Sequence, residues 1–212
     1  MKSLKSFLAL SAILCVSMLH AEDNIYIKQQ VAYKDQGANG KELTWDFGML
    51  SPINEEYTVA YFIPDSNCMH QWCATEHRTR YYYTLTADTI WRTGYENPTT
   101  IVQYTQPEAV LRLPLRYGDT LSTTFAAKGE YGHRIPMTLS GTNTIEVDAQ
   151  GKLILPDKTY EQVLRVHSQR QYVESGLDST AMLVDKYQWF AAESYIPVFE
   201  SVTAYEMVED SM

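Results

Sequence analysis

The chain of 212 residues carries 17 basic and 26 acidic side chains, a formal net charge of −9, and 45% of its residues are hydrophobic. This length suits one domain with a real core, or at most two small ones. The acidic balance argues against nucleic acid and anionic membranes as partners, because both are bound by basic surfaces.

The first 21 residues have the composition of a secretory signal peptide. Two lysines precede an apolar run over residues 7–19, and Ala21 is followed by an acidic pair. Such signals combine a basic start, a short apolar middle and a small residue at the cleavage position. The run is shorter than the roughly 20 residues of a spanning helix. Cys15 lies inside the run rather than after it, which argues against a lipoprotein.

We therefore predict cleavage near Ala21 and export to the periplasm or the extracellular medium as a soluble product of residues 22–212. Cleavage removes two lysines and no acid, so the product is more acidic than the full chain. No later stretch is long and apolar enough to predict a transmembrane segment.

The remaining chain is rich in aromatic residues, with all sixteen tyrosines and four tryptophans, which fit a pleated and half-buried surface. Apolar and polar positions alternate between turn signals. We predict strands over residues 25–27, 31–33, 57–63, 79–85, 89–95, 109–113, 120–126, 137–147, 152–155, 163–173, 182–192 and 198–207.

Three turns follow from residue types between these runs. Thr86 to Asp88 predicts a hairpin turn, residues 148–151 (DAQG) predict a second turn, and residues 194–197 join a closing hairpin. The two aromatic residues of Trp45-Asp46-Phe47 are predicted to anchor an early strand in the core. Short strands at regular spacing are typical of an all-β fold. We predict one antiparallel domain over residues 22–212, a sandwich or a strongly curved half-barrel.

The segment after the third predicted strand holds both cysteines that remain after cleavage. Cys68 and Cys73 form an even pair in an oxidising compartment, which predicts a disulfide that stiffens the loop over residues 65–76. With His70 and His77, the two thiolates have the ligand types of a zinc site. The C-x4-C spacing fits such a site poorly, so we predict no metal.

A tyrosine cluster in the first hairpin is the main candidate for ligand binding. Strand alternation sends Tyr81 and Tyr83 to one face, and Trp91 lies on the opposite strand. Exposed rings at these positions would stack on sugars or line an apolar pocket. The competing interpretation is that they fill the core or form cross-strand pairs. We predict Tyr81, Tyr83 and Trp91 as ligand-binding positions.

Several segments have a familiar form. Residues 37–47 read GANGKELTWDF, residues 113–120 read LPLRYGDT, and residues 151–166 read GKLILPDKTYEQVLRV. They resemble the WDF, PLxYGD and LxLPxxTYxxVLRV elements of uncharacterised secreted β-rich proteins of the Bacteroidetes, and residues 187–198 resemble their ending. The resemblance covers most of the chain after the leader. It implies an exported β-rich protein whose elements are architectural, and it carries over no catalytic residues.

No nucleophile elbow is present, and none of the histidines has a catalytic spacing. The sequence predicts a non-catalytic protein without a cofactor: a secreted or cell-envelope binding module for a protein or glycan partner. The alternative is a periplasmic carrier that holds a hydrophobic, lipid-like ligand in an apolar groove. A third hypothesis is a metal-dependent enzyme that uses the loop between Cys68 and His77.

Overall fold

The computed structural model describes residues 4–5, 11–16, 25–62, 71–192, 194 and 196–207. Every regular element within these ranges is a β-strand. In chain order the strands are β1 (Leu4–Lys5), β2 (Ser11–Val16), β3 (Ile25–Val31), β4 (Gly40–Asp46), β5 (Pro52–Phe62), β6 (Gln71–Glu76), β7 (Thr79–Thr86), β8 (Thr89–Asn97), β9 (Thr100–Arg112), β10 (Thr120–Tyr131), β11 (Ile135–Ile154), β12 (Thr159–Ser175), β13 (Ser179–Ala191) and β14 (Phe199–Met207).

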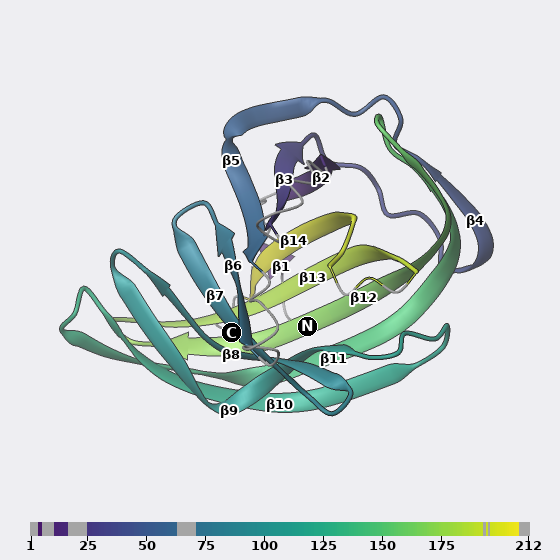
Figure 1. Cartoon of the computed structure of the whole chain (residues 1–212). Coiled ribbons are helices and arrows are strands. Elements are labelled where there is room, and N and C mark those ends of the chain that lie inside the picture. The colour runs from purple at the N-terminus through teal and green to yellow at the C-terminus, as the bar shows by residue number, and fades with distance from the viewer. Residues whose placement is uncertain are drawn as a thin grey trace.

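All of these strands belong to one sheet. Its order is β1-β14-β13-β12-β11-β10-β9-β8-β7-β6-β5-β3-β2, so most neighbours in space are neighbours in sequence. Each pair is antiparallel except β4, which lies off this path and pairs parallel to β11. Figure 1 shows that the sheet is strongly curved and that the long strands β9 to β12 lie in its middle. The predicted all-β, single-domain fold is confirmed, and its form is a curved single sheet rather than two packed sheets.

Part of the predicted signal peptide takes a place in this sheet. β2 lies within the apolar run and pairs antiparallel with both β3 and β14. Cleavage near Ala21 would take β1 and β2 out of the sheet. Export stays a prediction.

Both predicted hairpins are confirmed. In the first, Thr86 pairs with Thr89, so Ala87 and Asp88 alone form the turn. In the second, Trp189 pairs with Phe199 next to the connection between β13 and β14. The alternation of apolar residues that predicted these strands therefore also identified their partners.

The predicted turn over residues 148–151 is wrong, because β11 continues through it. Two register shifts flank this stretch, which marks it as a bulged part of the strand. Gly151 is needed there for close packing rather than for a turn: a Cβ on it would lie 2.1 Å from the Leu43 carbonyl oxygen of β4. The turn-like residues thus make room for the parallel strand β4.

The predicted loop over residues 65–76 is also partly wrong, because its second half is β6. Cys73 lies inside the ladder, opposite Phe62 of β5 and Tyr82 of β7. It is a free thiol, which corrects the predicted disulfide with Cys68, and burial raises the pKa of this thiol. Cys68 lies outside the described residues. A cysteine held between two strands is fixed by the ladder, which the sequence spacing did not show.

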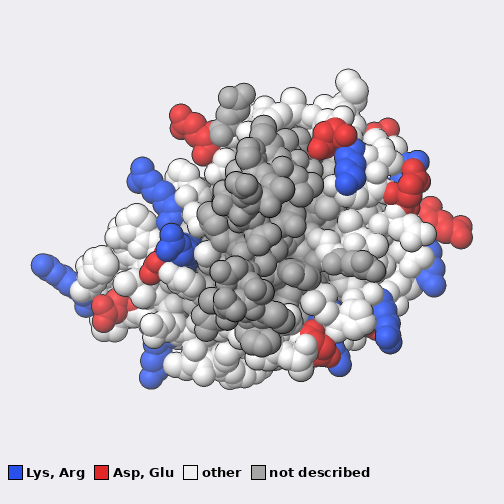
Figure 2. Space-filling model, viewed as in Figure 1, with Lys and Arg blue, Asp and Glu red and all other residues white. Residues whose placement is uncertain are grey.

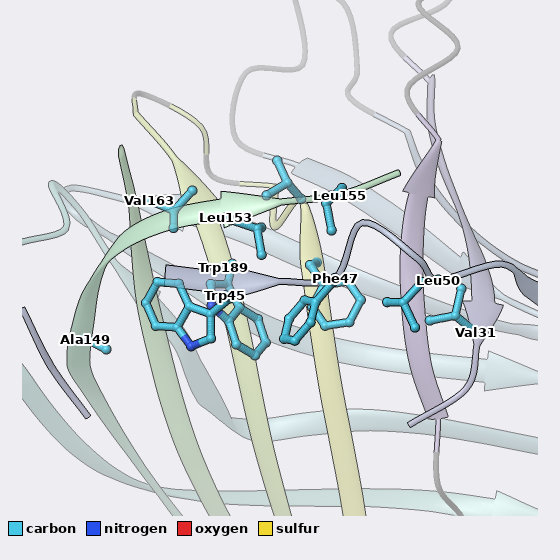
Figure 3. Close-up of a cluster of buried hydrophobic side chains, with 11 residues drawn as sticks. Val31, Trp45, Phe47, Leu50, Ala149, Leu153, Leu155, Val163 and Trp189 are labelled. Carbon is cyan, nitrogen blue, oxygen red and sulfur yellow. The ribbon is translucent and has the colours of Figure 1, made fainter. Parts of the chain in front are cut away.

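The two faces of the sheet carry different cores. On the outer face, the segment that includes β4 places Trp45, Phe47 and Leu50 on Trp189 and Phe199. We call this group the outer aromatic cluster, and Figure 3 shows its rings gathered beneath the end of β11. Trp189 is fully buried, with ring centroids 5.8 Å from both Trp45 and Phe47. The prediction that the Trp45 and Phe47 pair anchors an early strand is confirmed.

The inner face has two apolar layers with polar residues between them. Along β11, Met137 and Leu139 belong to one layer, Asn143 follows, and Ile145 and Val147 belong to the other layer. The same order recurs on β12, β9 and β8. We call the polar residues between the layers the inner polar layer. Its members on the neighbouring strands are Arg92, Glu108, Ser168 and Arg170.

Candidate ligand-binding sites

The inner polar layer surrounds a cavity of about 260 Å³. Residues from β5, β6, β7, β8, β9, β11, β12, β13 and β14 line it. Strands so far apart in the sheet share one cavity only because the sheet curls around it. We call this space the inner cavity.

A buried charge network forms one wall of the inner cavity. Glu108 is only 1% exposed. Its Oε2 accepts hydrogen bonds from Tyr104 at 3.0 Å, from Arg170 Nε at 3.1 Å and from Arg92 Nη1 at 3.4 Å, and its Oε1 lies 3.0 Å from Arg170 Nε in an ion pair. Two guanidinium groups and one carboxylate leave this cluster with one positive charge in excess. Burial alone disfavours the charged guanidinium of Arg92, but Glu108 and the neighbouring tyrosines outweigh it, so the pKa of Arg92 lies above its ordinary value.

Two buried polar atoms at the inner cavity have no hydrogen-bond partner among the described residues. They are Arg92 Nε, a donor, and Asn143 Oδ1, an acceptor. Asn143 is 4% exposed, and its Nδ2 donates to the Ala109 carbonyl at 2.9 Å. Each buried unsatisfied group costs about 1–3 kcal/mol. These two atoms therefore lower the stability of the folded state.

The second candidate is a larger and more apolar pocket at one end of the sheet, which we call the end pocket. Its volume is about 780 Å³. Leu113 and Leu115, from the segment between β9 and β10, face Leu164 of β12 and Phe190 of β13 there. Because these four side chains also belong to or pack against one inner apolar layer, that layer lies between the end pocket and the inner cavity. Glu42 and Glu161 contribute exposed carboxylates.

The structure separates the three residues predicted to bind ligand. Tyr81 and Tyr83 line the inner cavity, and their rings lie 5.3 and 5.9 Å from the Arg92 guanidinium carbon. Burial raises the pKa of Tyr83 to about 12, so its hydroxyl is neutral at physiological pH. Trp91 pairs with Thr84, the residue after Tyr83, and so points to the opposite face. Trp91 therefore does not join the two tyrosines.

Sequence reasoning missed the charged members of the inner cavity. Arg92, Glu108 and Arg170 come from three strands, and only tertiary folding brings them together. One signal was present: Arg170 falls on the same face of β12 as the buried Val166, at a position that alternation assigns to the interior. A charged residue on an apolar face predicts a buried ion pair, but not its partner.

The histidines take no part in either site. His77 and His133 are exposed turn residues with positive φ angles. His167 lies on the outer face, where its Nε2 is 2.5 Å from Asp185 and its ring stacks on Tyr187 at 4.1 Å. His70 is outside the described residues. Within the described ranges, no group of three or more His, Cys, Asp or Glu side chains is placed to hold a metal ion.

Comparison with known proteins found no matching family model, no matching curated protein and no matching solved structure. The resemblance to secreted Bacteroidetes proteins stays a prediction. Across the described residues there is no helix with the length and apolar composition needed to cross a membrane.

Proposed function

We propose that this chain is an exported, non-catalytic binding module that holds a small apolar ligand in the end pocket. The observation that carries the proposal is the pocket itself. Its volume of about 780 Å³ lies within the range of about 300–1,000 Å³ that is usual for small-molecule sites. Three leucines, a valine and a phenylalanine line it together with a proline and two alanines, so an apolar ligand gains binding free energy by leaving water there.

The acidic residues at the end pocket narrow the ligand class. Glu161 is exposed and receives a hydrogen bond from Lys152 at 2.9 Å, and Glu42 is exposed too. Carboxylates beside the apolar wall repel a fatty-acid carboxylate at that position. They are compatible with an uncharged ligand, and we assign a neutral, lipid-like molecule.

A surface partner is the competing assignment and has weaker support. On the described surface in Figure 2, basic and acidic side chains are interspersed rather than segregated. Complementary patches of one charge are what direct association with a charged macromolecule. The hollow apolar pocket is a more specific feature than this mixed surface, and it favours a carrier over a module that binds a protein.

The proposal is tested with the neutral fluorescent probe N-phenyl-1-naphthylamine, whose emission rises in apolar surroundings. The full-length protein should bind it, and Leu115→Glu should weaken binding at least about tenfold, because a carboxylate would then replace an apolar wall. Native mass spectrometry of the purified protein should show a co-purified apolar molecule that the variant lacks.

Leu177→Glu is the matched control. Leu177 is 72% exposed and follows β12, at the opposite end of that strand from Leu164. This variant should bind the probe as the unchanged protein does. Equal binding by both variants, with Leu115→Glu still folded by circular dichroism, would contradict the proposal.

A further inference from the structure

The inner face of the sheet changes from apolar to polar at the end pocket, and it does so on two neighbouring strands. Val147 of β11 pairs with Val166 of β12, and both belong to one inner apolar layer. Towards the pocket, the next residue on this face of β11 is Gln150, because it pairs with Leu164, two residues from Val166. Gln162 is the next residue on the same face of β12. Both glutamines line the end pocket.

The two glutamines are close enough to bind one head group. Gln150 lies directly opposite Leu164, and Gln162 is two residues from Leu164, so the glutamines are diagonal neighbours on one face. Diagonal neighbours lie about 7–8 Å apart, within reach of long side chains. Gln150 is partly buried and Gln162 is exposed, so neither glutamine is enclosed by the protein. One small head group in the end pocket can therefore contact both amides.

The apolar part of the end pocket begins beside these amides. Leu164 pairs with Phe190 of β13, and both side chains belong to or pack against the same inner apolar layer. An apolar chain gains binding free energy on this surface, while the other end of the ligand meets the glutamines. A few polar groups in a mostly apolar pocket fix the orientation of a ligand. The pocket therefore suits an amphiphile better than a pure hydrocarbon.

The two amides favour hydroxyl groups over a charged head group. Each glutamine amide offers both a donor and an acceptor, and a hydroxyl group offers both in return. A charged head group of either sign would lose hydration beside the apolar layer, which costs far more than burying a hydroxyl. The carboxylates of the pocket offset little of that cost for a cation. Glu161 is 73% exposed and already paired with Lys152, and Glu42 is exposed.

We infer that the end pocket selects a lipid with one apolar chain and an uncharged, hydroxyl-bearing head group, of the monoacylglycerol class. The chain lies on Leu164 and Phe190, and the head group forms hydrogen bonds with Gln150 and Gln162. This inference rests on the proposed function, because it names the ligand class of the same pocket and the residues that select it.

Displacement of N-phenyl-1-naphthylamine from the full-length protein tests this inference. The competitors share a chain of the same length and differ in the head group. 1-Monolauroylglycerol carries free hydroxyls, methyl laurate carries none, laurate is an anion and dodecylamine is a cation. 1-Monolauroylglycerol should displace the probe at a concentration about tenfold lower than any of the others, because only its head group forms hydrogen bonds with both amides without burying a charge.

Two variants remove the amides and keep side chains of similar size. Gln150→Leu and Gln162→Leu should both still bind the probe. Each should weaken 1-monolauroylglycerol about fivefold, while methyl laurate binds at least as tightly as before. Gln169→Leu is the matched control, because Gln169 is exposed on the outer face of β12, two residues from His167, and does not line the end pocket. It should leave all four competitors unchanged.

The results separate this inference from the proposed function. The inference is overturned if methyl laurate, laurate or dodecylamine displaces the probe as well as 1-monolauroylglycerol does. It is also overturned if Gln150→Leu and Gln162→Leu have no more effect than Gln169→Leu. In both cases the probe still binds, so the proposed function stands. A lack of probe binding by the unchanged protein would overturn the two together.

Discussion

Two buried arginines illustrate how the two faces of this sheet differ. Arg165, on the outer face, is 1% exposed and forms a two-point contact with Asp148 at 2.8 and 2.9 Å. It also donates to the carbonyl groups of Gln36, Gly37 and Ala38, so each of its nitrogen atoms has a partner. Arg92, on the inner face, has a longer contact to Glu108 at 3.4 Å, the rings of Tyr81 and Tyr83 at 5.3 and 5.9 Å, and an unsatisfied Nε.

The comparison teaches which buried arginine holds the fold together and which is only partly satisfied. Arg165 fastens the segment that precedes β4 to the outer face, and three aromatic rings lie 5.1–5.8 Å from its guanidinium carbon. Nothing in its hydrogen-bonding capacity is left over. Arg92 borders the inner cavity, but its unsatisfied Nε is itself buried. A buried charge with every donor satisfied contributes more to the stability of a fold than one with an unsatisfied donor.

The largest expected effect comes from Arg165→Met. Removing this arginine leaves Asp148 buried without its charge partner, which typically costs about 3–5 kcal/mol of unfolding free energy. Urea denaturation followed by tryptophan fluorescence measures the loss. A loss below about 1 kcal/mol would show that the contact between Arg165 and Asp148 does not stabilise the fold, and it would contradict the difference drawn between Arg165 and Arg92.

Gly151→Ala should have the next largest effect. The added Cβ meets the Leu43 carbonyl at 2.1 Å, so β4 must move away from β11, at a cost of about 1–3 kcal/mol. Gly176→Ala is the matched control, because the nearest atom to its added Cβ lies at 3.5 Å. Equal melting temperatures for the two variants would contradict the close packing of β4.

Arg92→Met should cost only about 1 kcal/mol or less in the same urea experiment. Glu108 keeps its contacts with Arg170 and Tyr104, and the unsatisfied Nε disappears with the side chain. The contrast with Arg165→Met is the sharpest test of the difference between the two faces. Equal losses for the two variants would assign both arginines the same structural role.

Tyr83→Phe should have the smallest effect at neutral pH, about 0.5 kcal/mol, and a clearer effect in alkali. Burial raises the pKa of Tyr83 to about 12 from its ordinary value of 10.0, so the folded state keeps a proton that the unfolded state loses. Its contribution to stability is complete below pH 10 and is lost as pH rises towards about 12. The variant should therefore lose less stability over this window in pH-dependent denaturation. Tyr131→Phe, at an exposed position, is the control.

Local pattern was enough for much of the sheet. Residues 163–173 alternate, and β12 buries Val166 while His167 turns to the outer face, as that pattern predicts. The same pattern failed at residues 148–151, because turn-forming residues there serve the parallel contact with β4. It also failed at Cys73, since a strand partner outside the local segment holds that residue in place.

The sequence by itself determined the all-β class, both hairpins and the burial of Trp45 and Phe47. These features depend on the periodicity of apolar residues and on residue types within short segments of the chain. The face of Trp91 follows from the two-residue turn, which pairs Trp91 with Thr84 rather than with Tyr83. Only the tertiary structure decided that Arg170 joins Arg92 and Glu108, because the curl of the sheet brings β9 and β12 to one cavity. Curvature is a property of the whole sheet, and no short segment encodes it.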